Sequence, residues 1–349
     1  MNKKFVQKTI LYSAVVLVLI AAIIVVVDPF SHYHMPFFGM EAVATEERSA
    51  LIGVAKHDTY DTALIGSSMS ENFVDSWFED GVFGNSAVKL CFQGAHFWDY
   101  EIVLDEVIKK PEVKNIVFGL DNYLLTDNPE ESEVTIPEYL YNDSIFDDAY
   151  YLWNKSVVFN YLPVFIANNK SEDFSDDNAY VWTNLYEYGK DPVLVSYLPF
   201  RPQVFEERLP SDYYFEYGDE FIEKITKYIE ARPDVQFSFY VPPYSALFWD
   251  YSLRKGKLEA EICVMDRVYS KLLEYDNVDL YYFQNDFDIV ENINNYRDYS
   301  HFKQEINYYM YECMRDKSHK LTKDTCYDTL LAMFGYAMNT DFDSYIESR

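Results

Sequence analysis

Short apolar runs alternate with helical patterns from about residue 60 onward, and this alternation constrains the fold most strongly. We predict strands in the five runs at residues 62–68, 89–94, 115–121, 235–243 and 278–283. We predict helices at residues 98–110, 217–232, 257–275 and 303–316. Strands that alternate with helices form a mainly parallel sheet covered on both faces. The sequence therefore predicts an α/β domain with a mainly parallel five-stranded sheet, whose sites lie at the carboxyl ends of the strands.

Residues 124–216 interrupt this alternation. The stretch is rich in tyrosine, aspartate and asparagine, and it contains Trp153 and Trp182. We interpret it as an insertion between the third and fourth strands. Two interpretations stay open: the insertion caps the site or shapes a substrate groove, or it is a structural excursion with a small core of its own.

An uncharged apolar run of 18 residues extends from Ile10 to Val27. At 1.5 Å per residue it spans roughly 27 Å, close to the hydrocarbon thickness of a bilayer. Lysines 3, 4 and 8 precede it, so the positive-inside bias predicts a cytoplasmic N-terminus. A cleaved signal peptide is the alternative, but its apolar region is shorter, and no small-x-small cleavage site follows Val27. We predict a single-pass protein of the cell membrane with an extracytoplasmic C-terminal domain.

These patterns divide the chain into four parts. Residues 1–28 form the cytoplasmic N-terminus and transmembrane helix, and residues 29–57 form a juxtamembrane linker that begins with an aromatic segment suited to the bilayer surface. Residues 58–318 form the α/β domain. Residues 319–349 form a C-terminal helix, at about 322–338, and an acidic tail.

Composition narrows the classes of ligand. The net charge of −29 disfavours nucleic-acid binding, which requires neutralisation of phosphates. None of the four cysteines forms a C-x-x-C pair, and the alternating His32 and His34 have no nearby Cys, Asp or Glu, so we expect no metal site. Export would permit a disulfide between Cys313 and Cys326, whereas Cys91 is expected to be a buried thiol.

Two short motifs carry candidate chemistry. Gly66-Ser67-Ser68 ends the first strand, where a serine is exposed at the sheet edge and a following helix N-terminus would stabilise an oxyanion. Asp298-Tyr299-Ser300-His301 follows the fifth strand and directly precedes a helix. Serine needs a base to become nucleophilic, and a carboxylate orients a histidine base, so Ser68, His301 and Asp298 are a candidate catalytic triad. Each motif also has a structural interpretation, as a steric turn and as a helix cap.

The order and placement of four short blocks resemble the SGNH hydrolase superfamily. LIGSSM resembles its first block, KLCFQGA the second, VFGLDN the third and RDYSHF the last. The resemblance covers roughly residues 58–318 and implies a flavodoxin-like three-layer domain with Ser68 as nucleophile and Asp298 and His301 completing the triad. It also implies an oxyanion hole formed by the backbone N–H groups of Ser68 and Gly94, with Asn122 contributing.

A single anchor followed by these motifs resembles, more narrowly, the D-alanyl transfer protein of teichoic-acid modification and the alginate-acetylation proteins. That resemblance implies an esterase or O-acyltransferase of the cell envelope, acting on a cell-surface glycan or related polymer with an acyl donor. It also implies a membrane-bound O-acyltransferase as partner. No metal or organic cofactor is expected. A catalytically inactive glycan-binding or assembly protein of the same fold is the alternative.

The third block departs from the family pattern Gly-x-Asn-Asp. This chain has Gly119-Leu120-Asp121-Asn122, with the amide one position late. An ionised Asp121 beside a developing oxyanion would oppose the reaction. Three solutions remain open: Asn122 replaces the amide, Asp121 is held neutral, or the hole uses backbone donors alone.

Overall fold

The computed structural model describes residues 3–42, 46–127, 137–142, 144–171, 175, 177 and 179–347. Parts of the predicted insertion, including residues 128–136, and the last two residues of the predicted tail therefore lie outside the described residues. The chain divides into two compact units. The first contains Met1–Thr59, Asp105–Val107 and Glu133–Tyr180, and the second contains Tyr60–Leu104, Ile108–Ser132 and Val181–Arg349.

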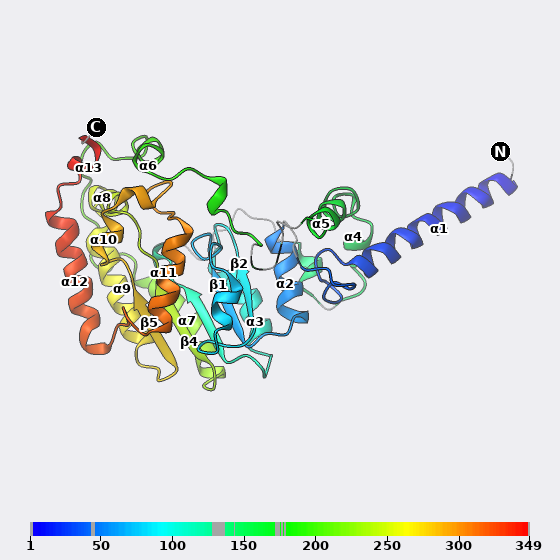
Figure 1. Cartoon of the computed structure of the whole chain (residues 1–349), viewed down its shortest axis with the longest axis horizontal. Coiled ribbons are helices and arrows are strands. Elements are labelled where there is room, and N and C mark those ends of the chain that lie inside the picture. Colours follow the sequence, from blue (N-terminus) through cyan, green and yellow to red (C-terminus); the bar gives the residue numbers. More distant parts are fainter. Residues whose placement is uncertain are drawn as a thin grey trace. The chain divides into compact units, whose positions relative to one another are not determined.

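The second unit is built on an all-parallel five-stranded sheet with the strand order β2-β1-β3-β4-β5 (Figure 1). Its strands are β1 (Thr62–Gly66), β2 (Ala87–Cys91), β3 (Asn115–Gly119), β4 (Gln236–Val241) and β5 (Val278–Tyr282). The prediction of an α/β domain with five strands is confirmed. Because every strand runs the same way, all five carboxyl ends lie at one edge of the sheet.

Helices cover both faces of this sheet. Alternate strand residues on one face, such as Phe118 and Tyr282, pack against rings of the covering helices, with centroids 5.0 Å apart for Tyr100 and Phe118. The helices of this face are α3 (Phe97–Val107), α7 (Phe215–Ala231) and α9 (Leu258–Leu272). The opposite face carries Leu64, Val117 and Tyr240, in one apolar cluster with residues of α8 (Ala246–Arg254) and α11 (Gln304–Arg315).

The predicted helices correspond to α3, α7, α9 and α11, with ends that differ by a few residues. The C-terminal helix predicted at 322–338 is α12 (Lys323–Asn339), which lies beside α9 (Figure 1). No helix is predicted at α8, which begins shortly after Pro242 and Pro243, two residues that favour a turn. Cys313 and Cys326 are buried and form no disulfide.

The second unit also contains several short elements. They are η1 (Asp75–Glu79), η2 (Asn122–Leu125), η6 (Thr183–Leu185), α6 (Lys190–Tyr197), α10 (Phe287–Val290), η7 (Ile293–Asn295) and α13 (Asp343–Glu347).

The first unit is formed by helices around the aromatic segment that follows the N-terminal helix. Its elements are α1 (Lys3–Val27), α2 (Glu47–His57), η3 (Glu138–Leu140), α4 (Ala149–Leu152), the π-helix η4 (Val157–Tyr161) and α5 (Leu162–Asn168). Among the residues that the structure describes, α1 is the one helix long and apolar enough to cross a membrane, and a signal sequence meets the same criteria.

Asp28 organises the chain where α1 ends. Its carboxylate accepts hydrogen bonds from the backbone N–H groups of His32, Tyr33 and His34 and from the hydroxyl of Tyr151. The two histidine rings then take different partners. The His32 ring lies 3.4 Å from Asp148, whereas the His34 ring contacts backbone carbonyls of α1 and of its own segment. They therefore do not face a common ligand.

Candidate active site

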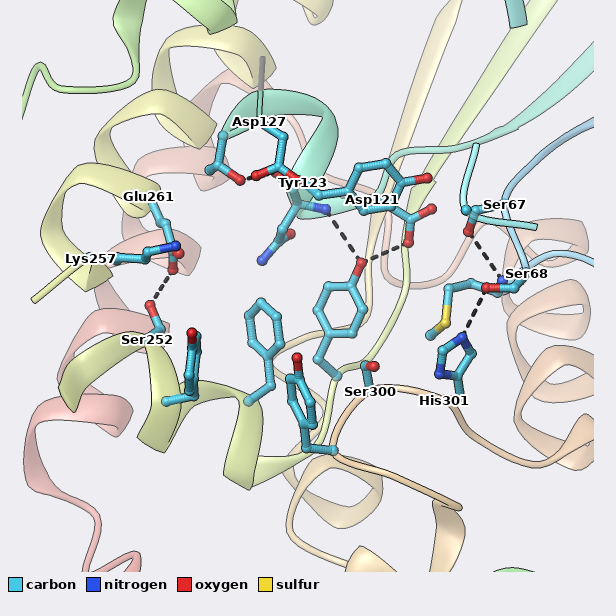
Figure 2. Close-up of a pocket in the computed structure, with 18 residues that line it drawn as sticks. Ser67, Ser68, Asp121, Tyr123, Asp127, Ser252, Lys257, Glu261, Ser300 and His301 are labelled. Atoms are coloured by element: carbon cyan, nitrogen blue, oxygen red, sulfur yellow. Dashed lines mark hydrogen bonds between the residues drawn. The ribbon is translucent and has the colours of Figure 1, made fainter. Parts of the chain in front are cut away.

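The second unit brings the three predicted catalytic residues together. The Ser68 Oγ lies 2.9 Å from His301 Nε2 (Figure 2), and His301 Nδ1 lies 2.8 Å from Asp298 Oδ2. Ser68 follows β1, whereas the other two residues lie between β5 and α11, so residues 233 positions apart in the sequence share one hydrogen bond. With the proton on Nδ1 directed at Asp298, Nε2 can accept the proton of the serine hydroxyl.

The short loop that carries His301 also fixes Asp298. Asp298 Oδ1 accepts hydrogen bonds from the backbone N–H groups of Ser300 (2.9 Å) and His301 (2.8 Å). Burial raises the pKa of Asp298, but the hydrogen bonds and charge of His301 and these backbone donors outweigh it, so the pKa lies well below its usual range. Asp298 is therefore ionised at neutral pH and can stabilise an imidazolium.

The turn after β1 distinguishes the two adjacent serines. Ser67 is buried, and its Oγ accepts a hydrogen bond from the backbone N–H of Met69 at 3.1 Å, whereas Ser68 is partly exposed and contacts the histidine. The expected helix after this strand is wrong: residues 67–72 form turns, and the next element is the short helix η1. Ser68 therefore gains no helix dipole, and its position depends on side chains that hold the turn.

Polar side chains of α11 hold this turn from one side. Asn307 donates to the carbonyl of Met69 at 2.8 Å, and Gln304 donates to the carbonyl of Asn72 at 2.9 Å. Both donors lie on the helix that begins just after His301. One helix thus positions the serine turn and follows the histidine loop.

Trp182 contacts both halves of the triad. Its indole N–H donates to the carbonyl of Ser68 at 3.0 Å, and its ring meets the His301 ring edge-on with centroids 5.6 Å apart. Asn72 Oδ1 holds this segment by accepting from the backbone N–H groups of Trp182 and Thr183, both at 3.0 Å. This part of the predicted insertion, residues 181–216, belongs to the second unit and shapes the site.

The triad opens onto a cavity of about 360 Å³ at the carboxyl edge of the sheet. All five strand ends contribute to its lining, through Ser68, Gly94, Asn122, Tyr244 and His301. The predicted oxyanion residues therefore line the same cavity as the nucleophile. Gly94 adopts a φ of +55°, a conformation that favours glycine, and no atom lies within 4 Å of where a Cβ would be.

Asp121 and Asn122, which form the shifted third block, are both buried at this edge. Tyr244 donates to Asp121 Oδ1 at 2.7 Å, and Gln284 donates to Asn122 Oδ1 at 2.9 Å. Among the described residues, Asp121 Oδ2 and Asn122 Nδ2 have no hydrogen-bond partner. Burial raises the pKa of Asp121, against the opposing effects of the Ser67 and Tyr244 hydroxyls and of His301. Figure 2 shows the Asp121 carboxyl on the side of the cavity that carries Ser67.

Sequence reasoning missed the rest of the cavity lining. One wall is aromatic, with Tyr244 and Phe248 stacked at 4.4 Å and Tyr251 and Tyr299 beside them. Across the cavity from the triad lie Asp127, Ser252, Lys257 and Glu261 (Figure 2). Burial raises the pKa of Glu261, while Ser252 and Lys257 oppose this shift. Of these residues, Tyr244 directly follows the run at 235–243 predicted as the fourth strand, and this place at a strand end is the signal that could have found it.

Comparison with known proteins does not assign the chain to a family. No protein-family model matches the chain, and no curated protein sequence is significantly similar to it.

Proposed function

We propose that this chain is a membrane-tethered serine esterase or O-acyltransferase with an SGNH-type, flavodoxin-like domain. The observation that carries the proposal is the continuous hydrogen-bonded chain from Ser68 through His301 to Asp298 at one wall of a cavity. The strand order 2-1-3-4-5, which doubly wound flavodoxin-like sheets share, supports the fold assignment.

The reaction begins when Ser68 Oγ attacks the carbonyl carbon of an ester. His301 takes the serine proton and then gives it to the leaving alkoxide as the ester C–O bond breaks. The acyl group is then held on Ser68. His301 then takes a proton from water or an acceptor hydroxyl, whose oxygen attacks the acyl carbon. As the bond from the acyl group to Ser68 Oγ breaks, His301 returns the proton to Ser68, giving hydrolysis or acyl transfer. Asp298 orients the imidazole and stabilises it while it is charged.

The substrate class follows from the anchor and from the lining of the cavity. We propose that α1 spans the cell membrane once, with a cytoplasmic N-terminus and an extracytoplasmic C-terminal domain. Such a domain meets cell-surface glycans and acyl donors held at the membrane, including those of a membrane-bound O-acyltransferase. The aromatic wall offers flat faces to sugar rings, and the polar residues opposite offer hydrogen bonds to hydroxyl groups.

A direct test uses the full-length protein in detergent. We expect hydrolysis of acetyl and other short-chain aryl esters and covalent labelling of Ser68 by a fluorophosphonate, because the hydrogen bond to His301 activates the hydroxyl. Peptide mapping by mass spectrometry would locate the label. An inert protein that resists the reagent would instead support a catalytically inactive glycan-binding or assembly protein.

We propose that Asp121 carries a proton and donates it through Oδ2 to the oxyanion, together with the backbone N–H groups of Ser68 and Gly94. Asp121 lines the same cavity as Ser68, its buried Oδ2 has no hydrogen-bond partner among the described residues, and burial favours the neutral carboxyl. Gln284 donates to the Asn122 carbonyl oxygen and leaves Asn122 Nδ2 without a partner among the described residues, so Asn122 is the second candidate donor. This proposal accounts for the departure of the third block.

Two variants of Asp121 test whether its side chain donates a hydrogen bond to the oxyanion. Asp121→Ala removes the donor and is expected to lower kcat/KM by about 10²- to 10³-fold, whereas Asp121→Asn supplies an N–H donor and should stay within about tenfold of the wild type. Wild-type activity should fall as pH rises through the raised pKa of Asp121, and the Asp121→Asn variant should lack this decline. Equal losses in both variants would contradict the donor role.

The pH dependence of the free energy of unfolding tests independently whether Asp121 is protonated in the folded protein. Because the folded-state pKa of Asp121 is raised, its stabilising contribution is complete below the unfolded-state pKa and is lost as pH rises through the folded-state pKa. The free energy of unfolding of the wild type, relative to Asp121→Asn, should therefore decrease over this interval. Denaturant titrations at several pH values measure it.

A further inference from the structure

The first unit exposes a set of large apolar side chains that its own core does not cover. We define this apolar surface by the exposed residues Ile145, Phe146, Tyr150, Trp153, Phe159 and Val164. Phe146 is 92% exposed and Phe159 is 69% exposed, and exposing this much apolar ring area to water costs free energy. Large apolar side chains exposed this close together in the sequence favour contact with a partner or a lipid phase.

The helices that carry this surface are apolar on both sides. Val157, Leu162 and Phe165 are buried in the core of the first unit, while Phe159, Pro163 and Val164 are exposed. Residues Val157–Asn168 together form a short apolar helical segment, too short to cross a bilayer. Asn160 is also exposed here, so the exposed side is apolar except for this one residue, and such a side favours an apolar environment.

The same part of the unit is attached to α1. The Trp153 indole N–H donates to the carbonyl of Leu17 at 2.9 Å, and α4 packs against α1. The Tyr151 hydroxyl donates to Asp28 at 2.8 Å, and Phe30 packs against the rings of Tyr151 and Tyr161. The apolar surface is thus continuous with the helix proposed to span the membrane.

The depth of the Trp153 contact is informative. Leu17 precedes Val27, the last residue of α1, by ten positions (27 − 17), which corresponds to about 15 Å along the helix axis. The hydrocarbon core of a bilayer is about 30 Å thick. A side chain that contacts α1 this far from its outer end lies within the hydrocarbon when α1 spans the membrane.

We infer that residues 144–167 lie in the outer leaflet beside α1, with the apolar surface in contact with lipid acyl chains. This inference rests on the proposed membrane anchor and extends it from one helix to a monotopic segment. Phe37 and Phe38, exposed just after α1, fit the same environment.

The polar groups of the segment are compatible with this location. Asp148 accepts from the Tyr33 hydroxyl at 2.9 Å and lies 3.4 Å from the His32 ring, and Asp147 accepts from Asn142. The exposed Lys155 has a long aliphatic chain that lets its ammonium group reach the headgroups. Tyr150 has an amphipathic ring that favours the membrane interface, whereas the indole N–H of Trp153, deeper along α1, is satisfied by the Leu17 carbonyl.

The experiment places the photoreactive residue p-benzoylphenylalanine at one position of the full-length protein. The protein is reconstituted in vesicles of phosphatidylcholine and phosphatidylglycerol, irradiated and analysed by mass spectrometry. Phe159 is the test position. Leu19, an exposed residue of α1, reports the anchor. Phe205, which is 62% exposed and is followed by Glu206 and Glu207, is the aqueous control.

We expect lipid adducts at positions 159 and 19 and none at position 205. Lipid adducts at 19 without adducts at 159 would overturn the inference and leave the anchor intact. A cross-link from position 159 to a second copy of the chain would also overturn it, since the surface would then be a protein interface. If neither 159 nor 19 labels lipid, the anchor and this inference both fail, while the catalytic proposal is unaffected.

Discussion

Ser68→Ala is expected to lower kcat/KM for ester hydrolysis by about 10⁴- to 10⁶-fold, because the covalent step loses its nucleophile. Ser68 Oγ is the hydroxyl that contacts His301, and the serine turn is held by backbone contacts that alanine preserves. The variant should therefore fold like the wild type, which circular dichroism and the melting temperature can verify. Steady-state hydrolysis of an aryl acetate measures the loss.

Ser67→Ala is the matched control for this substitution. Ser67 is the neighbouring hydroxyl, and its Oγ accepts from the backbone N–H of Met69 without contacting the histidine. Because the Ser67 hydroxyl also lowers the pKa of Asp121, Ser67→Ala should raise that pKa and change kcat/KM by about tenfold or less. If the alanine at position 67 abolished activity while the one at position 68 did not, the nucleophile would be Ser67 and the triad assignment would be wrong.

Asp298→Asn is expected to reduce kcat by about 10⁴-fold while the fold is retained, as happens when the carboxylate of such a triad is neutralised. The asparagine carbonyl can still accept from the backbone N–H groups of Ser300 and His301, so the loop should keep its shape. Its amide cannot stabilise the imidazolium and favours the wrong tautomer of His301. Single-turnover acylation by an aryl ester measures the effect on the chemical step.

A second Asp–His pair provides the control. Asp286 Oδ2 lies 3.4 Å from His319 Nε2, and neither residue lines the cavity of the triad. Asp286→Asn should lower the melting temperature without changing kcat, because the Asp286–His319 pair stabilises the fold and lies outside the cavity. A comparable loss of kcat in both variants would show that the Asp298 effect is structural rather than catalytic.

The strand pattern and the triad could be read from local features of the sequence. Short apolar runs mark buried parallel strands, and the spacing of Asp298 and His301 places both on one turn. A parallel topology then brings the turn after β1 and the loop after β5 to the same edge of the sheet. These inferences need only local periodicity and one general rule of topology.

The remaining parts of the site depend on long-range contacts that no local pattern contains. Trp182 lies 114 positions from Ser68 in the sequence, and only the folded chain brings its indole to the serine turn. Tyr244 contacts Asp121 because β3 and β4 are neighbours in the sheet. The turn after β1 has the small residues of a strand-to-helix junction, but the side chains of α11 hold it without a helix of its own.

In the parallel sheet, different connections between strands and helices supply different groups of residues to the cavity. Each strand ends in its own connection, and each connection contributes a different residue to the cavity. The connection after β4 and the helix that follows it carry aromatic lining residues, Tyr244, Phe248 and Tyr251, whereas Ser68 and His301 come from the first and last connections. If the proposed reaction holds, substitutions in the middle connections can change which molecule is accepted without altering the residues proposed to break the bond.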